Sequence, residues 1–229
     1  MKQNKPGAGG TKTINRCYIG QEFRATETDT GEKVIEGHPA IYNSTTQIGC
    51  WFNEIIERGA FDNADMTDVA LFVNHQQHRF PLARSRRNNG NSTMTLTIDD
   101  KGLAMRAVLD VEHNEDAKAV YSAVSRGDMD GMSFAFSVQD EEWENLDSDM
   151  PTRRIKAISK IYEVSVVTYP AYKDTDVHAR AEEDPPDGGK RELENARKEA
   201  FLEKEARQSV DTDSEVEKYR LRIGILGGM

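Results

Sequence analysis

From Ile14 to about Tyr172 the chain is a series of short apolar runs separated by turn residues, and this spacing limits what it can fold into. Apolar runs of about four to eight residues bounded by turn residues are typical of β-strands. None approaches the roughly 18 apolar residues that a membrane-spanning helix requires. The pattern therefore predicts one domain over residues 14–172 that is mainly β, with flanking helices.

The middle of this domain contains a buried strand and a hairpin. The run Val69–Val73 is continuously apolar, as expected for a strand that is covered on both faces. The segment Thr93–Ile98 alternates apolar and polar residues, and a turn sequence at 99–102 leads into a second run, Leu103–Val111. Two such runs joined by a short polar turn predict a β-hairpin.

A helix and two strands are predicted in the last part of the domain. Asn114 is a favourable helix cap, Gly127 can end the helix in a left-handed conformation, and the apolar residues between them fall on one face. Met132–Val138 then alternates small with large apolar residues, which predicts a strand with two different faces. After a charged connection at 140–154, a further strand is expected over Ile155–Tyr169.

The composition changes on both sides of this domain. Residues 1–13 lack apolar periodicity and are expected to form a flexible N-terminal tail. Residues 173–190 are acidic and contain Pro and Gly, which predicts a linker, and residues 191–229 are expected to form a helical C-terminal tail. Apolar positions in that tail form a narrow helical stripe, which needs a partner surface. They are Leu193, Ala196, Ala200 and Phe201.

The charge of the chain argues against two classes of partner. Among its 229 residues are 40 acidic and 30 basic side chains, which gives a formal net charge of -10. Binding to phosphate-rich surfaces needs clustered Lys and Arg. We therefore expect a soluble intracellular protein without nucleic acid or membrane as partner.

His75 is the first candidate for chemistry. It lies two residues after the predicted strand Val69–Val73, and a strand end holds a side chain rigidly. An imidazole held there can act as a base near neutral pH. The alternative is a surface histidine in a loop. A metal pair with His78 is a third interpretation, but the glutamate and the spacing of the helical zinc-protease motif are missing.

Ser133 and Glu163 are the second and third candidates. Ser133 follows Gly131 and shares a strand face with the small Ala135, which leaves room for a carbonyl group to approach a nucleophile. Glu163 lies in an otherwise apolar strand, where a carboxylate is unfavourable unless it is paired, so it could orient a histidine. The alternatives are a serine that faces solvent and an exposed glutamate on an edge strand.

In combination these segments resemble a known family, the prohead (capsid maturation) proteases of tailed bacteriophages, which are distantly similar to the herpesvirus assemblins. The resemblance covers roughly residues 16–172 and departs from the common pattern at Gln76 and Ala83. Its blocks are Glu54–Phe61, Val73–His75, Pro81–Arg84, Asp100–Leu103, Gly127–Phe136 and Tyr162–Tyr172.

The resemblance implies both a fold and a reaction. The fold is an assemblin-like β barrel, closed or nearly closed, with flanking helices. The reaction is cleavage of a peptide bond without a cofactor or a metal, with Ser133 as nucleophile, His75 as general base and Glu163 as the third member. Arg153 and Arg154 are candidate donors to the oxyanion; alternatively, they only pair with the acidic stretch at 140–149.

The resemblance also implies partners and a location. The substrates would be the major capsid protein, the scaffold and the protease itself, in the host cytoplasm inside the assembling prohead. The tail is expected to be cut between Arg180 and Met229, or else to remain as a helical arm for self-association. The alternative functions are a non-catalytic scaffold or binding module associated with the capsid, and a metal hydrolase that uses His75 and His78.

Overall fold

The structure, a computed structural model, describes residues 14–19, 21–168 and 189–206. Two β-sheets make up most of it. The seven-stranded sheet contains β1 (Ile14–Ile19), β4 (Thr45–Ile48), β5 (Phe52–Ile56), β6 (Ala70–Val73), β7 (Ala83–Arg84), β10 (Gly131–Glu144) and β11 (Thr152–Val167). The four-stranded sheet contains β2 (Gln21–Glu27), β3 (Lys33–Ile41), β8 (Met94–Ile98) and β9 (Gly102–Leu109). The helical elements are η1 (Arg86–Asn88), α1 (Glu115–Arg126) and the helix at 189–206.

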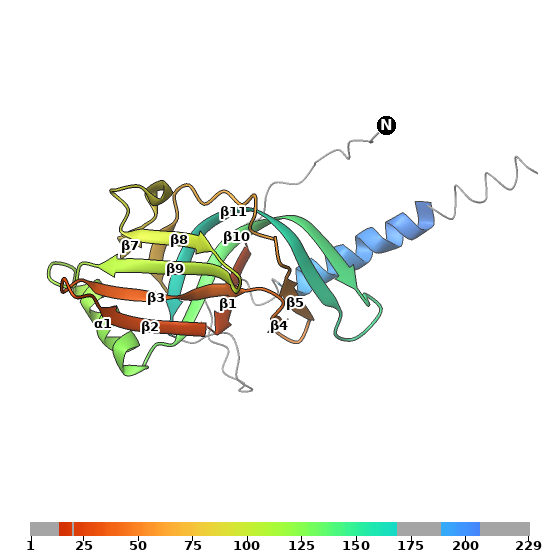
Figure 1. Ribbon diagram of the computed structural model, residues 1–229. Helices are drawn as coiled ribbons and strands as arrows, with labels where there is room; N and C mark the ends of the chain where they lie inside the picture. Colours follow the sequence, from red (N-terminus) through yellow and green to blue (C-terminus); the bar gives the residue numbers. More distant parts are fainter. Residues whose placement is uncertain (1–13, 20, 169–188, 207–229) are drawn as a thin grey trace, which may run out of the picture.

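The long strands β10 and β11 form the spine of the seven-stranded sheet (Figure 1). They pair antiparallel, and β1 continues the sheet beyond β10. The other edge of β11 is shared by two strands parallel to it: β5 along Thr152–Ile155, and β6 along Glu163–Val166. In this way β11 joins the β4–β5 end of the molecule to the β6–β7 end.

The core lies between the two sheets and α1, whose buried side chains face the four-stranded sheet. The prediction of a mainly β fold with flanking helices is therefore confirmed. The expected closed barrel is wrong for the part of the chain that the structure describes, because its strand pairings form two separate sheets. In those same segments no helix is both long and apolar enough to span a bilayer.

Strand β10 has the two different faces that its alternation predicts. Phe134 and Phe136 enter the core and stack with ring centroids 4.6 Å apart. Ser133, Ala135 and Ser137 alternate with them along the strand and are also fully buried. Because both faces are covered, the polar side chains on the second face need hydrogen-bond partners.

The predicted hairpin and helix caps are confirmed. The β8–β9 turn is closed by a hydrogen bond of 3.0 Å from Asp99 N–H to the Gly102 carbonyl. The Asn114 side chain accepts from the first turn of α1, and Gly127 ends that helix with φ 74°.

The charged connection expected at 140–154 is instead strand at both of its ends, 140–144 and 152–154, since β10 and β11 extend into it as a hairpin arm (Figure 1). Opposite charges face each other across this arm, as in the pair Glu142–Arg154. Such cross-strand pairs stabilise a polar hairpin. This explains why a sequence without apolar periodicity forms strands here.

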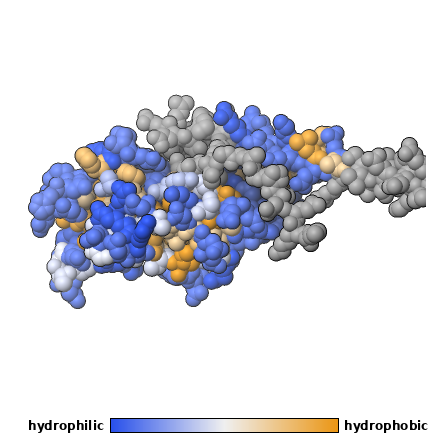
Figure 2. Space-filling view, turned by 90° about the horizontal axis from the view of Figure 1, so that it is seen from above, coloured by the Kyte–Doolittle hydropathy of each residue, from blue (hydrophilic) through white to orange (hydrophobic). Residues whose placement is uncertain are grey.

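The helix at 189–206 packs against the hairpin arm formed by β10 and β11. Leu193 and Ala196 are buried, and Arg197 donates to backbone carbonyls in the turn of the arm, those of Leu146 and Ser148. The predicted apolar stripe is therefore only half covered, because Phe201 remains 59% exposed. Figure 2 shows an apolar patch toward the outer end of this helix. The predicted flexible tail at 1–13, most of the predicted linker, and residues 207–229 lie outside the described residues.

Gly102→Ala is expected to destabilise the fold, because a Cβ atom at this position would lie 2.1 Å from the Ala40 carbonyl oxygen. Overpacking of this kind lowers the free energy of unfolding by about 1–3 kcal/mol. Gly90→Ala is the matched control, since its Cβ would meet nothing within 4 Å. Urea denaturation of the three proteins measures the difference, and equal stability of Gly102→Ala and Gly90→Ala would contradict the close approach.

Candidate active site

His75 lies in a tight turn directly after β6. The Gln76 N–H donates to the Val73 carbonyl at 3.0 Å, and the two residues between them, Asn74 and His75, have φ values of 48° and 58°. Positive φ at both central positions is the geometry of a type I′ turn, and Asn tolerates it well. The turn reverses the chain at once, so His75 is held close to the sheet.

Asn74 fixes this turn to the end of β11. Its backbone N–H donates to the Val166 carbonyl at 2.9 Å. Its side chain donates to Thr168 Oγ1 at 3.0 Å and accepts from the Thr168 N–H at 2.9 Å. These three bonds leave the neighbouring His75 little freedom to move relative to β11.

Ser133, His75 and Glu163 form a continuous chain of hydrogen bonds. Ser133 Oγ lies 2.7 Å from His75 Nε2, and His75 Nδ1 lies 2.5 Å from Glu163 Oε1. An ionised carboxylate only accepts hydrogen bonds, so Nδ1 carries the proton that is shared with Glu163. In the neutral ring Nε2 is then the acceptor, and the Ser133 hydroxyl donates to it.

The strand register brings the three side chains together. Ser133 pairs with Ser165 across β10 and β11, and Ala135 pairs with Glu163. Residues directly opposite in a ladder share a face, so Ser133 and Glu163 lie on the same side of the sheet. The parallel pairing of β6 with β11 then places the turn that follows β6 beside them.

All three side chains are buried, with exposed fractions of 0% for Ser133, 3% for His75 and 2% for Glu163. The alternatives of a solvent-facing serine, a surface histidine and an exposed edge-strand glutamate are therefore wrong. A buried carboxylate is unfavourable unless it is hydrogen-bonded. Glu163 meets this condition through both of its oxygens.

Ser165 is a member of the cluster that the sequence did not reveal. Its hydroxyl donates to Glu163 Oε2 at 2.6 Å and accepts from the backbone N–H of His75 at 3.2 Å. It therefore holds the second carboxylate oxygen and the histidine backbone at once. The available signal was the two-residue spacing from Glu163, but its meaning depends on the pairing with Ser133, which no local pattern contains.

The two arginines suggested as oxyanion donors lie elsewhere. Arg153 is twelve residues before Ser165 on β11, about 40 Å along an extended strand, and Arg154 is its neighbour. The expectation that they stabilise an oxyanion is therefore wrong. The alternative of charge pairing with the acidic stretch is confirmed by Arg153–Glu141 and Arg154–Glu144.

Arg153 also joins three separate parts of the fold. It is 4% exposed, and its guanidinium lies 3.1 Å from Glu54 on β5 and 3.1 Å from Glu192 on the C-terminal helix, in addition to Glu141 on β10. A buried arginine is stable only when carboxylates surround it. This cluster therefore fixes the hairpin arm and the helix together.

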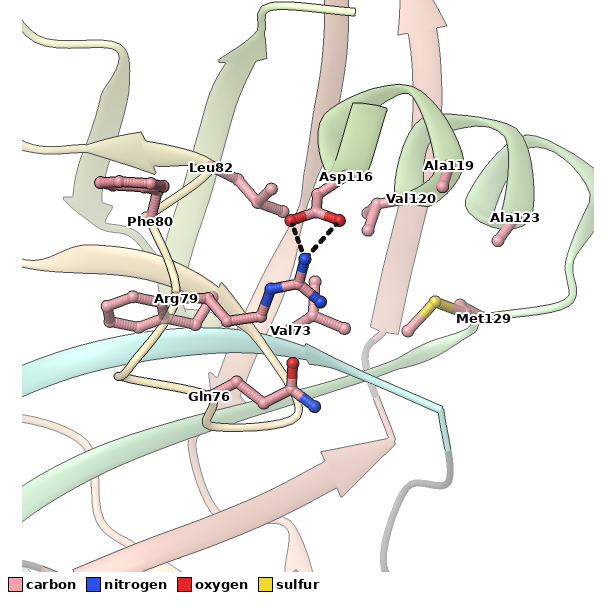
Figure 3. Close-up of a pocket in the computed structure, with 11 residues that line it drawn as sticks. Val73, Gln76, Arg79, Phe80, Leu82, Asp116, Ala119, Val120, Ala123 and Met129 are labelled. Carbon is pink, nitrogen blue, oxygen red and sulfur yellow. Dashed lines mark hydrogen bonds and ion pairs between the residues drawn. The ribbon is translucent and has the colours of Figure 1, made fainter. Parts of the chain in front are cut away.

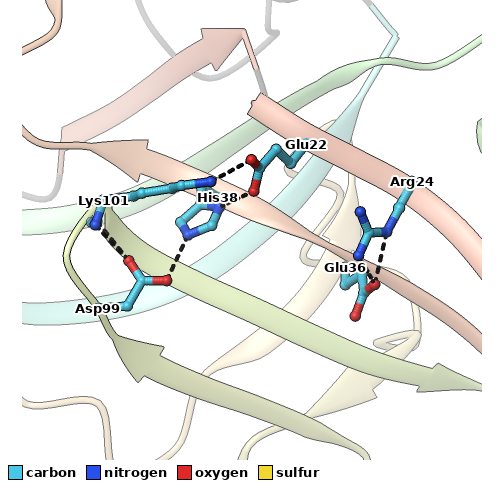
Figure 4. Close-up of polar contacts among 7 residues, drawn as sticks. Glu22, Arg24, Glu36, His38, Asp99 and Lys101 are labelled. Atoms are coloured by element: carbon cyan, nitrogen blue, oxygen red, sulfur yellow. Dashed lines mark hydrogen bonds and ion pairs between the residues drawn. The ribbon is translucent and has the colours of Figure 1, made fainter.

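His38 belongs to a second group of charged side chains, shown in Figure 4. Its Nε2 lies 2.9 Å from Asp99, and its Nδ1 lies 3.9 Å from Glu22, which also pairs with Lys101. These contacts tie β2 and β3 to the β8–β9 turn. They connect scaffold elements and bring no hydroxyl to the ring, in contrast to the cluster around His75.

The proposed metal pair has no geometric support. His75 directs both ring nitrogens to Ser133 and Glu163, and His78 is exposed. Across residues 14–19, 21–168 and 189–206, no group of three or more His, Cys, Asp or Glu side chains could hold a metal ion.

The chain is similar to known prohead proteases of phages. A family model described as caudovirus prohead serine protease matches residues 21–185, which include Ser133, His75 and Glu163. Over 155 residues the chain is 32% identical to the prohead protease of Enterobacteria phage HK97. That alignment covers 66% of this chain and 61% of the relative, so the chain spans about three fifths of the relative's length. No solved structure matches the chain.

Ser165→Ala is expected to loosen the cluster, because Glu163 Oε2 and the His75 N–H both lose a buried partner. The free energy of unfolding is expected to fall by about 1–3 kcal/mol, and the NMR signal of the His75 Nδ1 proton is expected to shift. Ser137→Ala is the control: this serine is buried on the same strand face as Ser133 but bonds Tyr162. If the His75 signal is the same in both variants, Ser165 does not position the histidine.

Proposed function

The chain belongs to the family of caudovirus prohead serine proteases, and from this premise we propose that it is a serine endopeptidase of phage capsid maturation. Ser133 is the nucleophile, His75 is the general base, and Glu163 orients the histidine. The observation that carries the proposal is the pair of hydrogen bonds of 2.7 Å and 2.5 Å that links the three side chains. The three side chains come from three segments that are far apart in sequence.

In the proposed mechanism the hydroxyl proton of Ser133 moves to His75 along the hydrogen bond that joins them. Ser133 Oγ attacks the peptide carbonyl while His75 Nε2 takes the hydroxyl proton. His75 then hands this proton to the departing amine, and water repeats the sequence to release the acyl group. Glu163 keeps Nδ1 protonated and stabilises the imidazolium that forms. The reaction needs neither a cofactor nor a metal ion.

Burial of the nucleophile adds a condition to this mechanism. Ser133 is fully buried, so a peptide carbonyl reaches its hydroxyl only after neighbouring atoms move. Local openings of this kind are common at active sites. A closed resting form suits a protease that must not cut before its substrate is in place.

The substrates that we propose are the major capsid protein and the scaffold, with the protease itself as a further substrate, inside the prohead as it assembles in the host cytoplasm. The name of the HK97 relative supports action on the prohead. In this proposal residues 14–172 contain the protease domain, which is preceded by an N-terminal tail at 1–13 and followed by a linker at 173–190 and a C-terminal tail at 191–229. The distant relation to the assemblins is part of the same proposal and rests on the sequence blocks alone.

For the tail, the contacts of the helix at 189–206 support a retained arm over removal of the whole segment. Its first turns are packed through Leu193 and Ala196 and are held by the ion pair of Glu192 with Arg153. A segment held in this way is protected from cleavage unless it first detaches.

The second candidate function is a non-catalytic binding module of the capsid. The observation in its favour is the exposed apolar end of the helix, where Phe201 is 59% and Leu202 52% exposed. An exposed apolar helix face is suited to a partner protein or to self-association. If co-expressed coat protein and this chain both stay full length while particles still form, the binding function is favoured.

Ser133→Ala is expected to abolish most cleavage of co-expressed coat protein, because Ser133 carries the hydroxyl that hydrogen-bonds to His75 Nε2. Experience with catalytic triads leaves a residual rate about 10³–10⁴ above the uncatalysed rate. His75→Ala is expected to be as damaging, and the double variant little worse, since the groups act as a unit. Mass spectrometry of the coat protein measures the outcome, with Ser137→Ala as a folded control. Complete cleavage by Ser133→Ala would reject Ser133 as the nucleophile.

A further inference from the structure

A pocket of about 270 Å³ opens beside the turn that carries His75 (Figure 3). One wall is formed by α1 through Ala119, Val120 and Ala123. The opposite side is formed by Val73 at the end of β6 and by Leu82. The interior is therefore mainly apolar.

The rim of the pocket is polar. Arg79, on the loop after His75, reaches across the opening to Asp116 on α1, and its Nη2 lies 2.9 Å from Asp116 Oδ2. Both side chains are about half exposed. Gln76 adds an amide to the same rim. An apolar interior with a few polar groups at the mouth is the arrangement expected where a side chain enters and the backbone that carries it stays outside.

The pocket is lined by residues close in sequence to both reacting residues of the proposed protease. Gln76 follows His75 directly in the chain, and Met129, which also lines the pocket, is four residues before Ser133. Four residues of extended chain span at most about 14 Å. A bound peptide advances about 3.3 Å per residue. The pocket is therefore within reach of a side chain one to four residues from a bond held at Ser133.

Two further features fit a peptide side chain as the occupant. The volume is slightly below the roughly 300–1,000 Å³ of sites for small molecules, and it has room for one large aliphatic or aromatic side chain. Ala119 and Ala123 are one helical turn apart on the same face of α1, so two small residues leave the space open. At the mouth, Phe80 is 91% exposed and offers an aromatic surface to whatever enters.

We propose that this pocket is a specificity subsite, which binds one large apolar side chain of the substrate peptide close to the bond that is cut. The proposal rests on the proposed function. Ala119 and Ala123 set the depth of the pocket, and the Arg79–Asp116 pair and Gln76 face the peptide backbone at its mouth. Each methylene of a side chain in an apolar pocket changes kcat/KM by about 10- to 200-fold, so the subsite selects strongly by size.

The experiment uses the full chain and peptides that span the coat-protein cleavage site, once that site has been mapped by mass spectrometry. Each position from four before to four after the cut carries Leu or Ala in turn. The wild type is expected to prefer Leu over Ala at one position by at least 10-fold in kcat/KM. Ala123→Leu fills the pocket and is expected to remove that preference, chiefly by a loss with the Leu peptide.

Two variants keep this test informative. Ala119→Leu, at a more exposed position of the same wall, replaces Ala123→Leu if the latter does not fold. Lys118→Leu adds the same side chain to an exposed position of α1 that does not line the pocket, and it is expected to keep the wild-type preference. If a folded Ala123→Leu or Ala119→Leu variant keeps the wild-type ratio of Leu to Ala cleavage, the subsite is rejected while the protease function stands.

A binding measurement distinguishes failure of the proposed subsite from failure of the proposed protease function. In a Ser133→Ala background, fluorescence anisotropy follows a labelled Leu peptide without cleavage, and Ala123→Leu is expected to weaken its binding about 10-fold. If the purified wild type does not cut these peptides but this loss is seen, the protease function fails and the pocket is retained as a peptide site. If Ala123→Leu changes only the oligomeric state in sedimentation, the pocket is an interface between copies and the proposal is overturned.

Discussion

The antiparallel pairing of β10 with β11 is the constraint on which the site depends. It sets Ser133 opposite Ser165 and Ala135 opposite Glu163, so the hydroxyl and the carboxylate share one face of the sheet while Phe134 enters the core on the other. A slip of one residue would exchange the two faces. The apolar alternation of β10 resists that slip, because it would place three large core side chains where Ser133, Ala135 and Ser137 now lie. Packing of the core thus protects the geometry of the chemistry.

The same two strands carry two buried ionic groups with different consequences. Near one end Glu163 is satisfied by His75 and Ser165, and the histidine still has a ring nitrogen that faces Ser133. Toward the other end several carboxylates surround Arg153, which makes that cluster a structural joint between β5, β10 and the C-terminal helix. The Pro81–Arg84 block of the sequence also has a structural role, because Arg84 binds Asp68 through two hydrogen bonds. These bonds hold the pKa of Asp68 below its usual range.

Local sequence patterns predicted the elements whose conformation depends on residues close together in the chain. Periodicity and turn residues identified β6, the β8–β9 hairpin, the caps of α1 and the two faces of β10, and burial in an apolar strand pointed to Glu163. The resemblance to prohead proteases joined Ser133 and His75. The features that the sequence did not predict correctly depend on contacts between residues far apart in the chain. The role of Ser165 and the position of Arg153 follow from the β10–β11 register, the charged arm becomes strand through cross-strand ion pairs, and the separation into two sheets depends on which edges meet.

The central claim is that His75 activates Ser133. Labelling with a fluorophosphonate, followed by peptide mass spectrometry, tests it most directly, because the reagent forms a stable adduct only with an activated serine. If the imidazole activates the hydroxyl, one adduct is expected, on the peptide that contains Ser133, and it is lost in a folded His75→Ala variant. An adduct on another serine, or labelling of Ser133 that persists at the wild-type rate without the imidazole, would contradict the account.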